Sequence, residues 1–465
     1  MKKKLVSVLL ATTMVMSMIS GCGSTANQEV ADTSAETPAA DVAEAPAEEV
    51  AEADTVEVSS DPFYIYSWNT ELGDRLEFVY AKYPEMKDRV VYVNVGDSAV
   101  YQEKIDALLQ TPDAEEYPDL IAMEAGYIMK YTNSDYTLPV TDLGITDADL
   151  TEMYPYTLTI ATDQRDDSLK GLSWQSCPGS MMYRRSLALE YLGTDDPAEV
   201  QEYFKDWDTF LETAEKLNAD SNGELKVLSS NADVSNVFNA NKTSPWVDAT
   251  GTFVMDPAME EYMDVVKVLE EKNLTGKTST WSEEWNAGAA SDNVFSYFGC
   301  TWFLHWTIKA NCGGEAVGEG TYGDWAMCQG PESYYWGGTW LGATVNCSDT
   351  AFAGQIMQAL CCDTEIMTSM SSETLDYVNN TAAMQTLSDQ GLGAYEFLGG
   401  QDFIEVFSPL AEQVDVSWMS AYDQKVNELF QTQLDAYSIG QKDKETAIAD
   451  FKTAVQEAYP SVTVE

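Results

Sequence analysis

The chain has 465 residues and a formal net charge of −52, because 77 aspartate and glutamate residues outnumber 25 lysine and arginine residues. Such an excess of negative charge makes nucleic acids and anionic lipid surfaces poor partners, whereas neutral or cationic ligands are compatible with it. The single histidine, His305, excludes histidine-rich metal sites, and any histidine-based catalytic triad would depend on this residue alone.

The N-terminal residues are typical of a secretion signal with a lipid attachment site. Three lysines at 2–4 precede an apolar run over 5–19, which is too short to span a bilayer comfortably as a helix. The run ends in Ile-Ser-Gly-Cys at 19–22, which resembles the bacterial lipobox, whose cysteine is lipidated. We expect a lipoprotein signal peptide over 1–22, with acyl chains such as palmitate on Cys22. An ordinary cleaved signal peptide is the alternative.

Residues 23–60 are predicted to form a disordered acidic tether. From residue 24 onward this segment has no aromatic residue, no lysine and no arginine, and it consists mostly of Ala, Glu, Thr, Ser and Pro. It cannot bury enough apolar surface to offset its ordering entropy. We therefore expect the folded part to sit on the outer face of the cytoplasmic membrane, most simply in a Gram-positive bacterium, with the lipid anchor as its only membrane contact.

The remaining part, 61–465, has about 400 residues, enough for roughly two to three average domains. It opens with the pattern of an α/β sheet. Apolar runs rich in β-formers occur near 63–67, 90–94 and 117–123, and helical periodicity separates them. This alternation predicts a largely parallel sheet whose ligands lie beyond the carboxyl ends of the strands, at the loops 67–71 and 124–127.

The second half is predicted to be more helical. We expect helices over 197–217, 257–273, 349–362, 421–435 and 443–458, and short strands near 179–183, 293–298 and 340–345. There is no internal repeat.

The order of four segments resembles the maltodextrin-binding-like, family 1 type of extracellular solute-binding proteins of carbohydrate ABC importers. The segments are YPDLIAMEAGYI, GLSWQSCPGSMMYRRSLALEYLG, WSEEWNAGAASDNVFSYFGCTWF and YYWGGTWLGATVN. The family usually has Tyr-Asn-Lys where this chain has Tyr183-Arg184-Arg185, and overall identity is low, so the family does not indicate which sugar is bound.

This resemblance implies an α/β, two-lobed periplasmic-binding-protein-like fold with a hinge and an interlobe ligand cleft. The N-terminal lobe would comprise 61–172 plus 340–378, and the C-terminal lobe 173–339 plus 379–465. Closure of the lobes around a ligand is the expected motion.

The resemblance also implies where ligand contacts lie in the first lobe. Trp68, Asn69 and Glu71 follow the first strand, and Glu124 and Tyr127 follow the third. Aromatic rings match the apolar faces of sugars, while carboxylates and amides accept hydrogen bonds from hydroxyl groups. The alternatives are capping of the following helix for the first group and simple loop solvation for the second.

Four further tryptophans are predicted ligand contacts. Trp174 and Trp340 lie at the two expected crossovers, and Trp246 and Trp302 match positions where the family stacks an aromatic ring on a sugar. Hinge packing is the alternative for Trp174. The other residues considered are expected to pack structurally: Trp207, Trp281, Trp285, Phe303, His305, Trp306, Trp325 and Trp418.

The seven cysteines other than Cys22 form an odd number without a metal-ligand pattern, so we expect mostly buried free thiols, with one or two disulfides left open. We expect a monomeric, non-enzymatic protein without cofactor or metal, which delivers a neutral oligosaccharide to ABC permease subunits. A peptide or polyamine ligand is the alternative. An extracellular glycoside hydrolase would need two opposed carboxylates, and no motif supports that reading.

Overall fold

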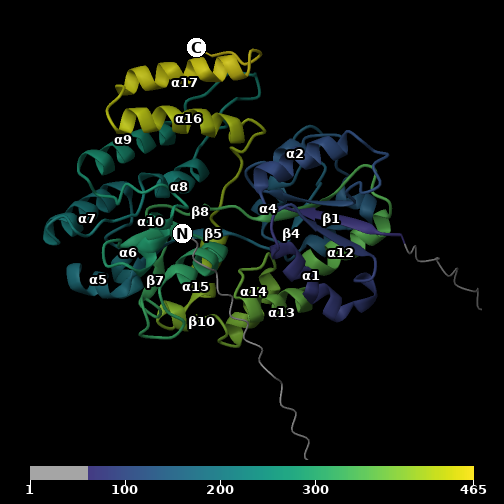
Figure 1. The fold of residues 1–465 in the computed structure, drawn as a ribbon, viewed down its shortest axis with the longest axis horizontal. Coiled ribbons are helices and arrows are strands. Elements are labelled where there is room, and N and C mark those ends of the chain that lie inside the picture. The colour runs from purple at the N-terminus through teal and green to yellow at the C-terminus, as the bar shows by residue number, and fades with distance from the viewer. Residues whose placement is uncertain (1–60, 465) are drawn as a thin grey trace, which may run out of the picture. The chain divides into compact units, whose positions relative to one another are not determined.

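The computed structural model describes residues 61–464. The expected signal peptide, the lipidation site Cys22 and the tether at 23–60 lie outside the described residues. Two sheets organise the described part, and the helices are distributed around them (Figure 1).

The first sheet has five strands in the order β2-β1-β3-β9-β4. The strands are β1 Phe63–Ser67, β2 Val90–Asn94, β3 Leu120–Glu124, β4 Leu172–Ser173 and β9 Thr339–Ala343. β1 is parallel to β2 and β3, as the sequence predicts, but β9 is antiparallel to both of its neighbours. The parallel arrangement expected from the sequence is therefore limited to β1, β2 and β3. Strand β9, which comes much later in the chain, runs in the opposite direction to its neighbours.

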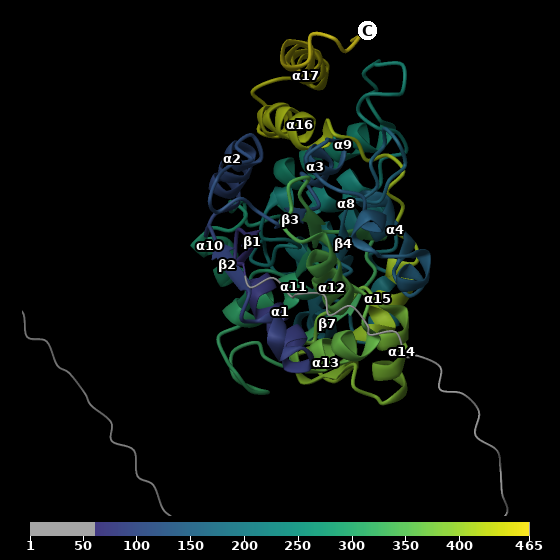
Figure 2. The same ribbon diagram turned by 90° about the vertical axis from the view of Figure 1, so that its right-hand side faces the viewer.

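Amphipathic helices cover this sheet. Helix α1 Glu71–Lys82 lies against α12 Thr350–Cys361 and α13 Thr364–Thr374 (Figure 2). Aspartate side chains accept hydrogen bonds from the first-turn amides of α12 and α13, and so satisfy donors that a helix start leaves unpaired. The buried helix face is what the sequence periodicity predicts, and the aspartate caps are seen in the structure.

The second sheet is antiparallel, with the order β6-β5-β7 and β8 also paired with β5. Its strands are β5 Pro178–Arg184, β6 Ser296–Gly299, β7 Trp325–Cys328 and β8 Tyr334–Tyr335. Every residue of these strands is buried.

Most of the remaining helices pack around the second sheet or extend from it. They are α2 Ser98–Leu109, α3 Ile128–Thr132, α4 Pro155–Ile160, α5 Arg185–Tyr191, α6 Pro197–Gln201, α7 Trp207–Asp220, α8 Ser235–Ala240, α9 Pro257–Glu271, α10 Glu283–Ala287, α11 Thr301–Phe303, α14 Thr381–Asp389, α15 Phe403–Ala411, α16 Asp423–Ser438 and α17 Lys444–Ala458. Of these, α2, α3 and α4 lie between β1 and β4 in the chain, in the part that forms most of the first sheet. A short two-stranded ribbon pairs β10 Ala394–Tyr395 with β11 Gln401–Asp402.

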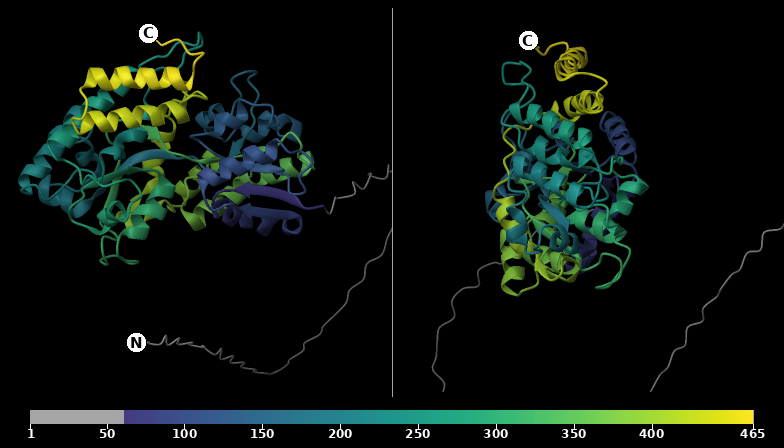
Figure 3. Two further views of the ribbon diagram at one scale, coloured as in Figure 1. Left: turned by 45° about the horizontal axis from the view of Figure 1, so that its top comes forward. Right: turned by 90° about the vertical axis from the view of Figure 1, so that its left-hand side faces the viewer.

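The last two helices, α16 and α17, form a hairpin and α16 also packs on α9 (Figure 3). Their observed bounds agree with the expected helices at 421–435 and 443–458 to within a few residues. Within residues 61–464, none of the helices has the length and apolar character needed to cross a membrane.

Three segments pass from one sheet to the other and are hydrogen-bonded to each other. The segment 174–177 follows β4, the segment 336–338 precedes β9, and the segment 375–380 follows α13. Backbone amides of Ser176 and Asn379 donate to Tyr377 and Trp174, and the amide of Trp336 donates to Cys177. The lobe boundaries drawn from the sequence, after residues 172, 339 and 378, stay a prediction.

Candidate functional site

A cleft made of two connected cavities lies beyond the carboxyl ends of β1 and β3. The large compartment has a volume of about 800 Å³ and the small compartment a volume of about 380 Å³. Both are lined by the same four residues, namely Trp68, Glu124, Trp336 and Gly337, so that the two compartments adjoin.

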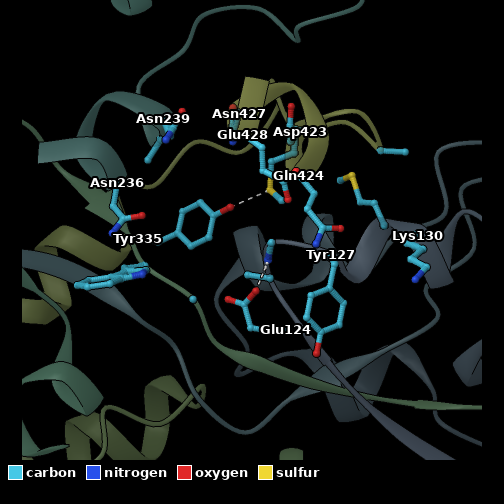
Figure 4. A pocket seen from close by; sticks show the side chains of 18 of the residues that line it. Glu124, Tyr127, Lys130, Asn236, Asn239, Tyr335, Asp423, Gln424, Asn427 and Glu428 are labelled. Carbon is cyan, nitrogen blue, oxygen red and sulfur yellow. Dashed lines mark hydrogen bonds between the residues drawn. The ribbon is translucent and has the colours of Figure 1, made fainter. Parts of the chain in front are cut away.

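The large compartment combines aromatic and apolar side chains with several amide and carboxyl groups. Figure 4 shows amide side chains from α8 and α16, among them Asn236, Asn239 and Asn427, around the same space as Glu124. The only lysine among the described lining residues, Lys130, forms an ion pair with Asp106 at 2.5 Å. This compartment therefore offers hydrogen-bonding groups with little uncompensated positive charge.

Glu124, at the end of β3, stands where the two compartments meet. Its Oε2 accepts a hydrogen bond from the backbone N–H of Gly126 at 2.7 Å. Burial raises the pKa of Glu124 to about 7, although that hydrogen bond favours the ionised form. The carboxyl group can accordingly act as an acceptor or, when protonated, as a donor near neutral pH.

Glu71, the first residue of α1, lines the small compartment beside an ion pair. Gln175 donates to Glu71 Oε1 at 3.1 Å, and Arg75 Nη2 lies 3.9 Å from the same oxygen. Arg75 also donates through Nε to Asp376 at 2.7 Å. Burial and the neighbouring Asp376 raise the pKa of Glu71 to about 7 against the lowering effects of Arg75 and Gln175. Glu71 is thus tied to two of the three crossing segments.

A group of tryptophans forms the wall between the compartments. The ring centroids of Trp302 and Trp336 are 5.0 Å apart with planes at 65°, and Trp281 lies 5.8 Å from Trp336. Across the cleft, Trp68 packs edge-on against Tyr127, with centroids 6.0 Å apart. Aromatic faces and edges are therefore presented from segments of the chain that are far apart in sequence.

Trp281 has an uncommon backbone conformation. Its φ angle is +69°, which is sterically unfavourable for a bulky side chain, and its side chain is 53% exposed. The ring packs between Trp285 and the Trp302–Trp336 pair. Strain of this kind persists when the surroundings hold it in place, and it concentrates at binding sites.

The segment 295–306 divides between the core and the cleft. Phe295, Tyr297 and Phe303 are buried, as expected, and Gly299 makes close contact with the Phe303 ring, which a side chain at Gly299 would overlap. Trp302, a predicted ligand contact, lines the small compartment.

The neighbouring residues His305 and Trp306 differ in their contacts and in their exposure. His305 has the structural role expected, because its Nε2 lies 3.1 Å from the carbonyl oxygen of Leu375, and burial lowers its pKa. Trp306, expected to pack on a helix face, is instead 60% exposed and lines the small compartment. The turn at Leu304–Ile308 is a π-helix, whose wider turn changes the direction of the side chains that follow.

Six of the nine predicted contact residues are brought together around the cleft: Trp68, Asn69, Glu71, Glu124, Tyr127 and Trp302. Asn69 also has the alternative role considered for it, since its Oδ1 accepts from the amide of Glu71 at 3.1 Å at the start of α1.

The other three predicted contacts, Trp174, Trp246 and Trp340, are fully buried and line neither compartment. Trp246 packs against Phe253, Phe430 and Phe451, and Trp340 donates a hydrogen bond to the carbonyl of Thr157 at 2.9 Å. We therefore leave these three tryptophans out of the candidate site.

Several lining residues were missed or assigned to packing from the sequence. They are Tyr335, Trp336, Trp281, Trp306 and Trp418. Trp336 could have been found, because it directly precedes Gly337-Gly338 at the second crossover. The exposure of Trp281 depends on its left-handed backbone conformation, for which its neighbours in the sequence give no signal.

The chemistry that this cleft offers is stacking and hydrogen bonding. No group of three or more His, Cys, Asp or Glu side chains in residues 61–464 is arranged to hold a metal ion, and the seven cysteines of this part are free thiols. Rings, amides and carboxyls arranged around two adjoining compartments suit a ligand with apolar faces and a polar rim.

Two sheets with their helices, joined by three crossing segments and with a cleft beyond the carboxyl ends of β1 and β3, define the periplasmic-binding-protein class of fold, as the sequence predicts. The family model of bacterial extracellular solute-binding proteins matches residues 79–391, and the chain belongs to this family. No curated protein matches the sequence.

Solved structures share this fold at low identity. An extracellular solute-binding protein of family 1 is 18% identical with a TM-score of 0.71, over 87% of this chain and 100% of the other. An ABC-transporter-associated binding protein from B. animalis subsp. lactis Bl-04, in complex with β-1,6-galactobiose, is 17% identical with a TM-score of 0.67, over 88% and 100%. The galacto-N-biose/lacto-N-biose I-binding protein of Bifidobacterium longum is 13% identical with a TM-score of 0.66, over 87% and 98%.

Proposed function

We propose that the protein is a lipid-anchored substrate-binding protein that captures an oligosaccharide and delivers it to the permease of an ABC transporter. One observation carries this proposal: Trp68, Trp302 and Trp336 line a continuous cleft together with carboxyl and amide groups. The sugar-bound neighbours in the same fold support it.

The two compartments give the ligand an expected length. A combined cavity with a shared wall at Trp336 and Glu124 suits a chain of more than one ring, with at least one ring on each side of that wall. The affinity expected for such stacking and hydrogen bonding is in the micromolar range, roughly 8 kcal/mol of binding free energy.

Isothermal titration calorimetry with a panel of neutral oligosaccharides of two to five units tests the proposal. We expect one linkage type to bind in the micromolar range and to remain chemically unchanged after long incubation. Binding to peptides or polyamines with no affinity for any glycan would contradict the proposal, and release of shortened sugars would identify a hydrolase instead.

The lipid anchor has a separate test. The full-length chain expressed in a Gram-positive host is expected in the membrane fraction, carrying acyl chains on Cys22. A Cys22→Ser variant should carry no acyl chain and appear in the medium or as an uncleaved precursor of higher mass, and acylation equal to that of the parent would rule out attachment at this residue.

A further inference from the structure

The small compartment has an unbalanced charge. Among the described residues that line it, two are glutamates, Glu71 and Glu124, and none is a lysine, an arginine or a histidine. Every other lining residue is an uncharged polar residue, a glycine or a tryptophan. The compartment therefore carries carboxyl groups without a cation of its own inside it.

The cation nearest to Glu71 is already shared. Arg75 makes its short contact, 2.7 Å, with Asp376, and only a long one, 3.9 Å, with Glu71. Arg75, Asp376 and Glu71 together contain one guanidinium group and two carboxyl groups. They carry one net negative charge when both carboxyl groups are ionised. Asp74 adds a further nearby negative charge.

Glu124 forms no ion pair with any cation in residues 61–464, whereas Glu71 pairs with Arg75. Its Oε2 accepts from Gly126, while its Oε1 has no hydrogen-bond donor among the described residues and faces Gly337, which lines both compartments. The groups packed near this carboxyl are the uncharged Tyr127 and Tyr335 and the backbone of Gly126. An acceptor oxygen thus points into the cleft without a partner.

Four tryptophans surround the same space: Trp68, Trp302, Trp306 and Trp336. The face of an indole ring carries partial negative charge and attracts ammonium groups within about 6 Å of its centre. Carboxylates combined with several indole rings favour a cation over a neutral hydroxyl group, because each of these groups stabilises positive charge.

We propose that the small compartment is a subsite for a protonated amine, and that the captured oligosaccharide carries an amino-sugar unit whose ammonium group lies between the carboxylates of Glu71 and Glu124 and the surrounding tryptophans. This inference rests on the proposed function and specifies its ligand. The amide-rich large compartment holds the uncharged remainder of the chain.

The acid–base state of the two carboxyls is consistent with this subsite. In the free protein burial raises the pKa of both Glu71 and Glu124 to about 7, so that a proton resides on each for part of the time near neutral pH. An ammonium group favours the ionised carboxylate and lowers these pKa values. At a pH where the ligand amine is already fully protonated, amine binding is therefore accompanied by proton release from these carboxyls, whereas binding of a neutral sugar is not.

Calorimetry with a matched ligand pair tests the inference. The probes are a β-1,4-linked glucosamine trimer, at a pH where its amines are protonated, and its fully N-acetylated counterpart. We expect the amine form to bind at least about tenfold more tightly, with proton release shown by titration in buffers of different ionisation enthalpy. Raising the salt concentration should reduce the amine form's advantage.

Two variants test whether Glu124 contributes to the preference for the amine. Glu124→Gln keeps the shape of the side chain and removes its charge, and it should reduce the preference for the amine to less than about threefold and remove roughly half of the proton release, since Glu71 remains. Glu445→Gln, exposed on α17 and lining neither compartment, is the matched control and should retain the full preference.

The possible outcomes separate the two proposals. Equal or tighter binding of the N-acetylated trimer overturns the amine subsite and leaves an oligosaccharide-binding protein. Affinity for neutral glycans of the panel but for neither trimer also overturns it. Binding of spermidine without affinity for any glycan supports the cationic subsite and overturns the proposed function. No binding of any amine or glycan overturns both.

Discussion

The indole nitrogen of Trp302 donates a hydrogen bond to the backbone carbonyl of Trp336 at 3.2 Å. The bond joins the start of the helical segment after β6 to the chain just before Gly337 and Gly338, whose φ angles of +68° and +112° a residue with a side chain rarely adopts. The two rings are consequently held at a large angle to each other, with Trp302 lining the small compartment and Trp336 lining both.

Trp302→Ala is expected to reduce ligand affinity more than tenfold, about 1.4 kcal/mol or more, with little change in melting temperature. The substitution removes both a stacking surface and the hydrogen bond to Trp336, while the side chain is only half-buried. Calorimetric titration and thermal melting measure the two effects. Ile439→Ala, at an exposed site that lines neither compartment, is the control, and an unaltered affinity of Trp302→Ala would remove this ring from the site.

Trp281→Gly is expected to weaken binding while leaving the free energy of unfolding within about 1 kcal/mol of the parent. Glycine tolerates a φ of +69°, so relief of backbone strain offsets the lost contacts with Trp302 and Trp336. Chemical denaturation measures the free energy of unfolding, and calorimetric titration measures the ligand affinity. A large loss of stability would show that the ring serves packing, as first expected from the sequence.

The stability of the unliganded protein should fall as pH rises from about 4.5 to about 7, through the contribution of Glu124. The pKa of this carboxyl is raised from 4.5 in the unfolded chain to about 7, so the folded state binds more protons across this window. Glu124→Gln removes this contribution. Its melting temperature relative to the parent should therefore increase from pH 5 to pH 8, and a constant difference would contradict the raised pKa.

Trp340→Phe tests a residue that the sequence assigned to ligand contact and the structure buries in β9. Loss of the indole N–H leaves the carbonyl of Thr157 without its partner, which costs about 1–3 kcal/mol of folding free energy. We expect this destabilisation in denaturant titration together with unchanged ligand affinity. More than tenfold weaker binding by the folded variant would return Trp340 to the candidate site.

The part of the site that follows parallel strands could be predicted from the sequence. Trp68 and Glu124 come directly after buried strands, and the carboxyl ends of such strands meet at one edge of a sheet. The strand–helix order and the bounds of α9, α12 and α17 were predictable for the same reason, since their periodicity is local.

The remaining contacts depend on features that the local pattern does not encode. A π-helical turn directs Trp306 into the small compartment although an α-helical projection assigns it to packing. Trp340 looked accessible beside a glycine pair, yet β9 pairs with strands on both sides and its residues are all buried. Burial of that kind follows from tertiary pairing, which the sequence of β9 does not reveal.

The position of the chain's one histidine makes it a natural spectroscopic probe. The ring of His305 lies between Leu375 of the third crossing segment and Tyr395, three residues after the wall formed by Trp302. A proton spectrum in which only histidine is isotopically labelled thus contains the signals of a single imidazole ring. Changes in the chemical shifts of these signals during a ligand titration would report rearrangement of the crossing segments, without any engineered label.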